Sequence, residues 1–377
     1  GLMGTGYFLG FMLSSLIAPK MVRAVGHIRV FSALAAMASA ATLGFVLWIN
    51  PYGWIGLRFV SGFCFAGLFM TVESWLNQSI GNDARGRLLS VYRLVDLGFV
   101  TGGQLLLPVI GIEGFAIFAF TAIVLSLSAV PVSLADRTSP MPPKSARFNL
   151  AEVWKISPIA CLGCITIGLT NSSFRLVGPL YASRLGFDTA AVAFFMAMGI
   201  VGGAVLQYPL GWLSDRYDRR WVLIGATTGA ALAGQFLAHY AASGAVYAYG
   251  GAFAFGAFSL PLYSLSAAHA NDRAGKEQYV MLAAGLMFFF SGGAALGPAL
   301  AAWFLENRGT PAFFTYISAM HGLLIFLTLW RMSVKPKPAK TARGRFMALM
   351  RTSPVLLRMA RAASGNTKTA HKRKRGN

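Results

Sequence analysis

The chain has 377 residues, of which 56% are hydrophobic and only 12% are charged. Soluble domains average about 25% charged residues, so this composition disfavours a soluble enzyme, a secreted disulfide scaffold and a disordered protein. It predicts instead a polytopic membrane protein. The charge is unbalanced, with 33 Lys and Arg against 12 Asp and Glu, a net charge of +21. The five histidines are isolated from one another, so we expect no metal site and no cofactor.

Eleven stretches of the chain are long and apolar enough to cross a bilayer as helices, which takes about 20 residues each. In chain order they are 2–18, 30–49, 53–76, 91–111, 114–134, 158–180, 189–210, 221–240, 244–268, 279–304 and 312–331. The short alternating pattern typical of β-barrel strands is absent from the sequence, so helices must satisfy the backbone. The predicted fold class is therefore all-α.

The loops between these stretches alternate between rich and poor in basic residues. One set of loops, together with the C-terminal tail, holds 28 Lys and Arg, whereas the opposite set holds only Arg184 and Arg308. By the positive-inside rule the rich set is cytoplasmic. We therefore expect a multi-pass protein whose C-terminus is cytoplasmic.

A weak internal repeat relates the two parts of the chain at an offset near 190 residues. The matched positions are Gly62 and Gly67 with Gly251 and Gly256, Asn82-Asp83 with Asn271-Asp272, Gly102-Gly103 with Gly292-Gly293, and Pro108 with Pro298. Six spans separate the partners, so the repeat predicts two six-helix halves of the same orientation. The partner of the span at 158–180 falls before residue 1. We therefore expect twelve helices in the full protein, with the first transmembrane helix missing from this chain.

These patterns divide the chain into four parts. The predicted parts are an N-terminal helical half at 1–134, a central cytoplasmic loop at 135–157, a C-terminal six-helix half at 158–331 and a basic cytoplasmic tail at 332–377.

The loop after the span at 189–210 carries a charged motif. The segment Gly211–Arg220 reads GWLSDRYDRR and resembles the GxxxDRxGRR motif of the major facilitator superfamily (MFS), with Asp218 in place of a Gly. The corresponding first-half segment, Lys20–Arg29, is degenerate and has Arg23 where the motif has Asp. Carboxylate and guanidinium groups here can pair across a cytoplasmic seam. We expect a latch formed by Gly211, Asp215, Arg216, Arg219 and Arg220; the alternative is a charge run that only fixes topology.

Two further segments resemble the same family. Arg58–Gly62 is similar to its fourth-helix RxxxG motif, and the segments 73–77 and 85–89 are similar to YcaD-like bacterial permeases. The resemblance covers residues 1–331 and implies an MFS fold, residence in the bacterial cytoplasmic (inner) membrane and carrier function rather than catalysis. It also associates Arg58 with proton movement or with the central cavity. The alternative for Arg58 is snorkelling to the outer interface.

Charged residues inside the predicted spans are few. Glu73 and Asp96 are the acidic residues well within spans, where a charge costs roughly 3 kcal/mol and usually pairs or marks a pathway. Arg93 lies three residues from Asp96 on one helix, and Glu73 ends the preceding helix on the same side, so the three can form one cluster. One interpretation is proton coupling, in which a carboxylate titrates between two states. The alternative is a fixed ion-pair network that closes the inner gate.

Several polar side chains mark the second half as the place to look for a solute site. The candidates for a substrate cavity are Asn171, Ser173, Arg175, Gln207 and Tyr263. The alternative for each is an interhelical hydrogen bond. For Arg175 the alternative is snorkelling.

The tail is strongly basic. Residues 331–377 hold 14 Lys or Arg and no acidic residue. We expect it to bind anionic lipid at the inner leaflet rather than nucleic acid.

Together these observations favour a secondary active transporter, acting as a monomer, that moves a small solute by alternating access coupled to protons or another ion. The alternatives are a membrane-embedded sensor or non-transporting MFS-derived protein, and a membrane-bound transferase. No Walker A pattern occurs in the sequence, so direct use of ATP is unsupported.

Overall fold

The computed structural model describes residues 1–79, 85–111, 114–134, 149–275 and 278–334. Within these residues all regular structure is helical. The elements are α1 (Leu2–Val25), α2 (His27–Leu47), α3 (Pro51–Ser79), α4 (Arg85–Ile110), α5 (Ala116–Ser133), α6 (Leu150–Ile156), α7 (Pro158–Arg184), α8 (Thr189–Arg216), α9 (Arg219–Tyr240), η1 (Ala241–Ser243), α10 (Ala245–Ser259), α11 (Leu262–Asn271), α12 (Tyr279–Arg308) and α13 (Thr310–Val334).

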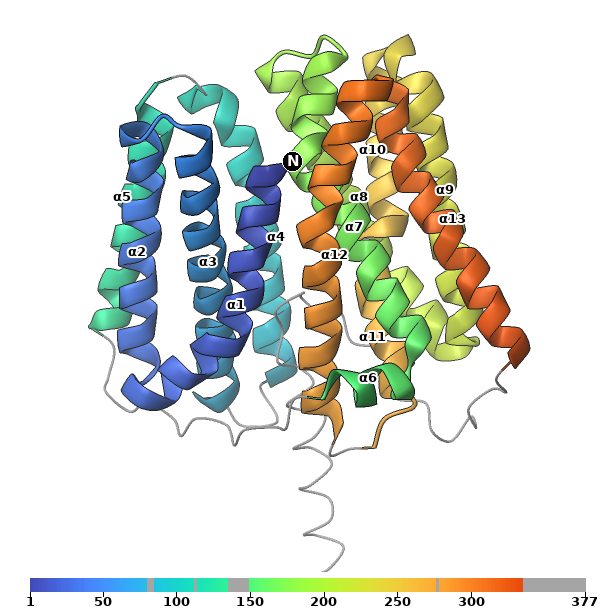
Figure 1. Cartoon of the computed structure of the whole chain (residues 1–377), viewed down its shortest axis with the longest axis horizontal. Coiled ribbons are helices and arrows are strands. Elements are labelled where there is room, and N and C mark those ends of the chain that lie inside the picture. Colours follow the sequence, from blue (N-terminus) through green and yellow to red (C-terminus); the bar gives the residue numbers. More distant parts are fainter. Residues whose placement is uncertain (80–84, 112–113, 135–148, 276–277, 335–377) are drawn as a thin grey trace, which may run out of the picture.

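The helices form two bundles side by side, α1–α5 in one and α7–α13 in the other (Figure 1). Ten stretches of the described residues are long and apolar enough to span a membrane, one of them α10 and α11 taken together. The eleventh predicted span is α4, whose apolar part, Gly98–Ile110, is shorter. The all-α, multi-pass fold predicted from the sequence is confirmed. We call the end of the molecule where α6 lies the α6 end.

The predicted span at 244–268 is a broken helix. α10 ends at Ser259 and α11 begins at Leu262, with Leu260 and Pro261 between them. Proline has no N–H and its ring crowds the preceding turn, which interrupts a helix at this point. The predicted span is confirmed as Ala245–Asn271, although two residues interrupt its helix.

The segment predicted as a central loop contains a short helix, α6. Asn149 caps it by accepting a hydrogen bond from the Glu152 N–H at 3.2 Å, a common way to start a helix. Val153 is fully buried and lies against Gly285 of α12. Trp154 also packs beside Phe289 of α12, with ring centres 5.9 Å apart, so apolar contacts anchor this segment to the second half.

The two halves repeat one close helix contact. In the first half, a Cβ added at Gly62 of α3 would lie 2.7 Å from the carbonyl carbon of Tyr7 of α1. In the second half, a Cβ added at Gly256 of α10 would lie 2.6 Å from the carbonyl carbon of Gly199 of α8. Both glycines therefore let two helix backbones touch, as small residues do in membrane bundles.

A second pair of contacts fixes the register of the repeat. A Cβ at Gly10 of α1 would lie 2.8 Å from the carbonyl carbon of Phe59, and one at Gly202 of α8 would lie 2.8 Å from that of Phe253. Gly62 of α3 is thus equivalent to Gly256.

The sequence-based pairing of Gly62 with Gly251 is wrong by five residues. A Cβ at Gly251 faces the side chain of Leu237 of α9 instead of the backbone of α8. The equal GxxxxG spacing in α3 and α10 hid the shift, because both helices carry glycines on more than one face.

The halves meet along two seams, α1 with α12 and α4 with α8. At the first seam, Thr5 Oγ1 donates a hydrogen bond to the Ala295 carbonyl at 2.6 Å, and the rings of Phe8 and Phe290 lie 6.4 Å apart. Because α1 is equivalent to α8 and α12 to α4, the two seams are copies of each other under the repeat.

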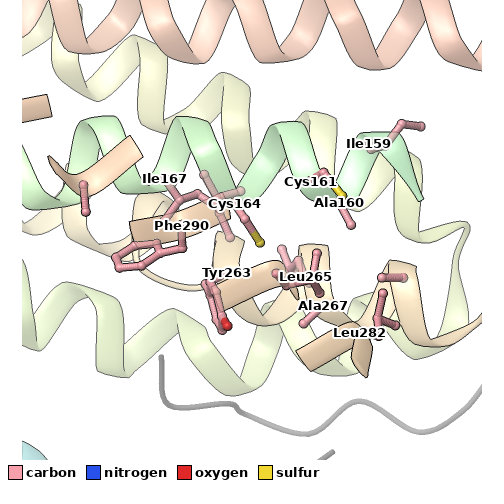
Figure 2. Packing of buried hydrophobic residues seen from close by; sticks show 14 of the residues in the cluster. Ile159, Ala160, Cys161, Cys164, Ile167, Tyr263, Leu265, Ala267, Leu282 and Phe290 are labelled. Carbon is pink, nitrogen blue, oxygen red and sulfur yellow. The ribbon is translucent and has the colours of Figure 1, made fainter. Parts of the chain in front are cut away.

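α7 is the most enclosed of the candidate spans, with 72% of its apolar window buried. Figure 2 shows Cys161, Cys164 and Ile167 of α7 packed beside Phe290 of α12 and Leu265 of α11. Both cysteines are unpaired thiols in this core and serve as small apolar packing residues.

Candidate functional site

The loop motif forms a charge network at the α6 end of the second half. Arg219, the first residue of α9, lies 2.6 Å from Asp272 through Nε and 3.3 Å from Asp215 through Nη1. Its Nη1 also donates to Ser214 Oγ at 2.9 Å. The Arg219 and Asp272 side chains are only 3% and 4% exposed. A charge this deeply buried is stable only when it is paired and hydrogen-bonded, as it is here.

Asp218 explains the departure from the family motif. Its Oδ1 accepts from the Arg220 N–H at 3.1 Å and so caps α9, a role that suits a carboxylate at a helix N-terminus. Its Oδ2 also lies 3.1 Å from Arg220 Nη2. Asp218 therefore supplies a cap and a partner for Arg220, neither of which a glycine offers.

Two further basic residues of this end lie against rings. The Arg216 guanidinium sits 3.9 Å from the centre of the Trp212 ring, a cation–π contact. Arg273 donates from Nη1 to the ring of His269, 3.0 Å from Nδ1. Burial, and after it the charge of Arg220, lowers the pKa of Arg273 below its ordinary value.

The motif residues and their partners tie α8, α9 and α11 together. Gly211 is buried in α8. Among the described residues, the ion-pair and hydrogen-bond partners of the motif belong to the second half. Sequence reasoning included Asp215 and Arg219 but did not include Asp272 or Ser214. Asp272 follows α11, more than fifty residues along the chain, and its only signal was its place in the repeat.

Two of the three side chains in the cluster proposed for proton coupling are outside what the structure describes. Glu73 is on α3 and Arg93 on α4, but their side chains are not described. Asp96, also on α4, is half-buried. Their grouping therefore remains a prediction.

Asn171 belongs to a buried polar group at the break between α10 and α11. Ser259 Oγ donates to Asn171 Oδ1 at 2.6 Å, and Asn171 Nδ2 donates to the Ser259 carbonyl at 3.4 Å. His321 Nε2 of α13 lies 3.4 Å from the same Ser259 Oγ. The Asn171 amide therefore donates a hydrogen bond to the backbone carbonyl of the last residue of α10, where the helix is interrupted. Ser259 and His321 were missed by sequence reasoning.

The other polar candidates mostly bond to helices as well. Gln207 Nε2 donates to Ser264 Oγ of α11 at 3.0 Å, and Ser173 Oγ donates to the Leu169 carbonyl of its own helix. Tyr263 is 6% exposed, and its ring lies 5.8 Å from that of Phe290.

The two arginine candidates differ from these polar residues in their exposure. Arg175 on α7 is exposed, and so is Arg58 on α3. The Arg58 guanidinium lies over the Phe45 ring, 5.2 Å from its centre.

Comparison with known protein families gives a match along almost the whole chain. The family model described as Major Facilitator Superfamily matches residues 1–206 and again residues 160–367. YE1530 of Yersinia enterocolitica, described as an uncharacterized MFS-type transporter, is 27% identical over 348 residues, which are 90% of this chain and 87% of that protein. YcaD of Escherichia coli, described in the same words, is 24% identical over 340 residues, 90% of this chain and 88% of YcaD.

Solved structures show the same fold. A variant of the nucleoside transporter NupG has a TM-score of 0.74 at 10% identity and covers 88% of this chain and 91% of its own. FucP, described as an E. coli fucose:proton symporter, has a TM-score of 0.56 at 12% identity, with 88% of this chain and 90% of FucP covered. At this level of identity the likeness is one of fold alone.

Proposed function

The chain belongs to the Major Facilitator Superfamily, and we propose on this premise that it carries a small solute across the membrane by alternating access coupled to protons. The observation that supports this most directly is the pair of repeat-related seams, α1 with α12 and α4 with α8. Two similar bundles joined along two equivalent seams can rock against each other, opening one end as the other closes.

In this proposal the charge network at the α6 end stiffens one of the two moving halves. Arg219 joins the ends of α8 and α11 to the start of α9 through two carboxylates. This makes the α6 end of the second half a stiff unit that moves as one body. Glu73 and Asp96 are the carboxylates that we assign to proton coupling, with Arg93 as their partner.

We place the α6 end in the cytoplasm of a bacterium, because the basic loops and the basic tail lie on that side of the predicted topology. The tail then faces the anionic inner leaflet, where its Lys and Arg are attracted to lipid headgroups. A reporter enzyme active only in the cytoplasm, fused after Asn377, would be active. The same fusion made at Gly244, between α9 and α10, would be inactive. The reverse pattern would overturn the orientation.

Transport itself is tested in proteoliposomes that hold the full chain and a pH-sensitive dye inside. We expect one member of a panel of sugars, nucleosides, amino acids and organic acids to move protons with it, and a protonophore to abolish its accumulation. Solute accumulation that is unaffected by the protonophore would contradict proton coupling.

The coupling residues are tested by a double variant, Glu73→Gln with Asp96→Asn, against the control Glu306→Gln, which changes an exposed acid at the opposite end. We expect the double variant to bind solute but to lose proton-driven accumulation. Wild-type accumulation in the double variant would show that these carboxylates only pair.

A further inference from the structure

Two arginines, one from each half, lie at membrane depth without a carboxylate partner among the described residues. Arg58 belongs to α3 and Arg175 to α7, and both are exposed. A guanidinium inside the bilayer is costly unless it faces a partner or a wet space. The structure describes no Asp or Glu in an ion pair with either one. As far as the described part of the chain goes, their charge is therefore available to a molecule that is not part of the chain.

Both arginines lie at a similar depth. Arg58 is seven residues from the start of α3 at Pro51, and Arg175 is nine residues before the end of α7 at Arg184. At about 1.5 Å per residue they are roughly 10 Å and 13 Å from the helix ends opposite the α6 end. The Arg58 guanidinium lies over the buried ring of Phe45 of α2, a contact that holds it against the first bundle.

α1 brings the two arginines to one place. Gly6 lies against the Ile55 backbone of α3, one turn before Arg58. Gly4 lies against the side chain of Leu176, the neighbour of Arg175 on α7. Tyr7 lies on α1 between these contacts and the contact of Gly10 with Phe59, on the helix that touches both arginine-bearing helices.

Aromatic rings continue from this point toward the second half. The Tyr7 and Phe8 rings are 5.3 Å apart, those of Phe8 and Phe290 are 6.4 Å apart, and those of Phe290 and Tyr263 are 5.8 Å apart. A run of rings that begins at Tyr7 thus crosses the seam between α1 and α12. Aromatic surroundings suit an apolar or aromatic molecule better than a bare inorganic ion.

We propose that Arg58, Arg175 and Tyr7 bind the anionic head of the transported solute, an organic carboxylate or phosphate ester with an apolar or ring-shaped body. The proposal rests on the transport function above and names the solute class. Guanidinium groups donate paired hydrogen bonds to carboxylate and phosphate oxygens, and the phenol adds one more donor. Because one arginine comes from each half, a bound anion offsets their mutual repulsion and draws the halves together at this level.

The proposal is tested by calorimetric titration of the full chain in detergent with benzoate, phenyl phosphate and inorganic phosphate. Benzamide serves as a neutral match for benzoate. We expect at least one phenyl-bearing anion to bind, and to bind at least tenfold more tightly than inorganic phosphate or benzamide. Which of the two anions binds distinguishes a carboxylate from a phosphate ester. Equal binding of benzoate and benzamide, or binding of neither phenyl-bearing anion, would overturn the proposal.

Variants assign the binding to the two arginines. Arg58→Gln and Arg175→Gln should each weaken binding of the anion at least tenfold, Arg175→Lys should recover part of the loss, and Tyr7→Phe should cost several-fold. The control is Arg308→Gln, an exposed arginine at the end of α12, which should bind as the wild type does. Unchanged affinity in both Gln variants, with unfolding temperatures like that of the wild type, would refute the site.

The outcomes separate this proposal from the transport function. If a neutral solute is accumulated normally by Arg175→Gln, transport stands and the anion site fails. If the anion binds through the two arginines but crosses no vesicle, the site stands and transport fails.

Discussion

The glycine contact between α8 and α10 gives a sharp test of the repeat. A Cβ added at Gly256 would lie 2.6 Å from the carbonyl carbon of Gly199 and closer still to its oxygen, whereas ordinary contacts lie at 3.4–4 Å. To accommodate the change Gly256→Ala, the two backbones must part by roughly 1 Å, and overpacking of this kind typically costs about 1–3 kcal/mol. We therefore expect a lower unfolding temperature and weaker packing of α10 on α8.

The control lies on the same helix. Nothing approaches the position of a Cβ at Gly250 within 4 Å. Gly250→Ala relieves the cost of glycine inside a helix, about 0.5–1 kcal/mol, so the unfolding temperature should stay the same or rise slightly. A thiol-reactive fluorescent dye reports unfolding through the native cysteines, because all three are fully buried in the folded chain.

The equivalent pair in the first half is Gly62→Ala with the control Gly56→Ala, which also meets nothing within 4 Å. Gly62→Ala should lower the unfolding temperature in the same direction as Gly256→Ala, because its Cβ would lie 2.7 Å from the carbonyl carbon of Tyr7. If Gly256→Ala unfolds at the same temperature as Gly250→Ala, the helices are not in backbone contact and the reasoning fails.

Three further predictions use the same dye assay. Asp272→Asn should lower stability by about 1–3 kcal/mol, because it weakens the 2.6 Å pair with the buried Arg219, whereas the exposed Glu306→Gln should change little. Asn171→Leu should cost a similar amount, roughly 1–3 kcal/mol, by leaving the Ser259 carbonyl without its amide donor; full stability would show that the bond is dispensable. The folded chain should resist a maleimide and react only on unfolding, and rapid labelling would contradict the buried cysteines.

The spans could be predicted from the sequence because each rests on a local property. A run of about 20 apolar residues must be helical in lipid, whatever it packs against. The same reasoning failed where few residues decide the structure. The seven residues of α6 form a helix because Asn149 caps it and Val153 reaches α12. The break at Pro261 sits inside a run whose overall hydropathy is still that of one span.

The candidate site was predictable only in part, because its bonds join residues that are far apart in sequence. Asp215 and Arg219 are only four residues apart, so a contact between them could be predicted from the sequence. Asp272, which follows α11, pairs with Arg219 as well, and no local spacing in the sequence indicates this pair. The same holds for Asn171 and Ser259, which are 88 residues apart and meet only because α7 packs against the broken helix.

The two halves share their helix packing, but among the described residues different contacts join the equivalent helix ends. His27 begins α2 as Arg219 begins α9, and Gly26, at φ 86°, precedes it where Asp218 caps the second half. His27 Nε2 hydrogen-bonds Ser74 Oγ of α3 at 3.0 Å, whereas Arg219 forms an ion pair with Asp272 after α11. A buried ion pair is costly to break, whereas a neutral hydrogen bond contributes about 1 kcal/mol. Among the described residues, the α6 end of the second half is therefore held by the contact that costs more to break.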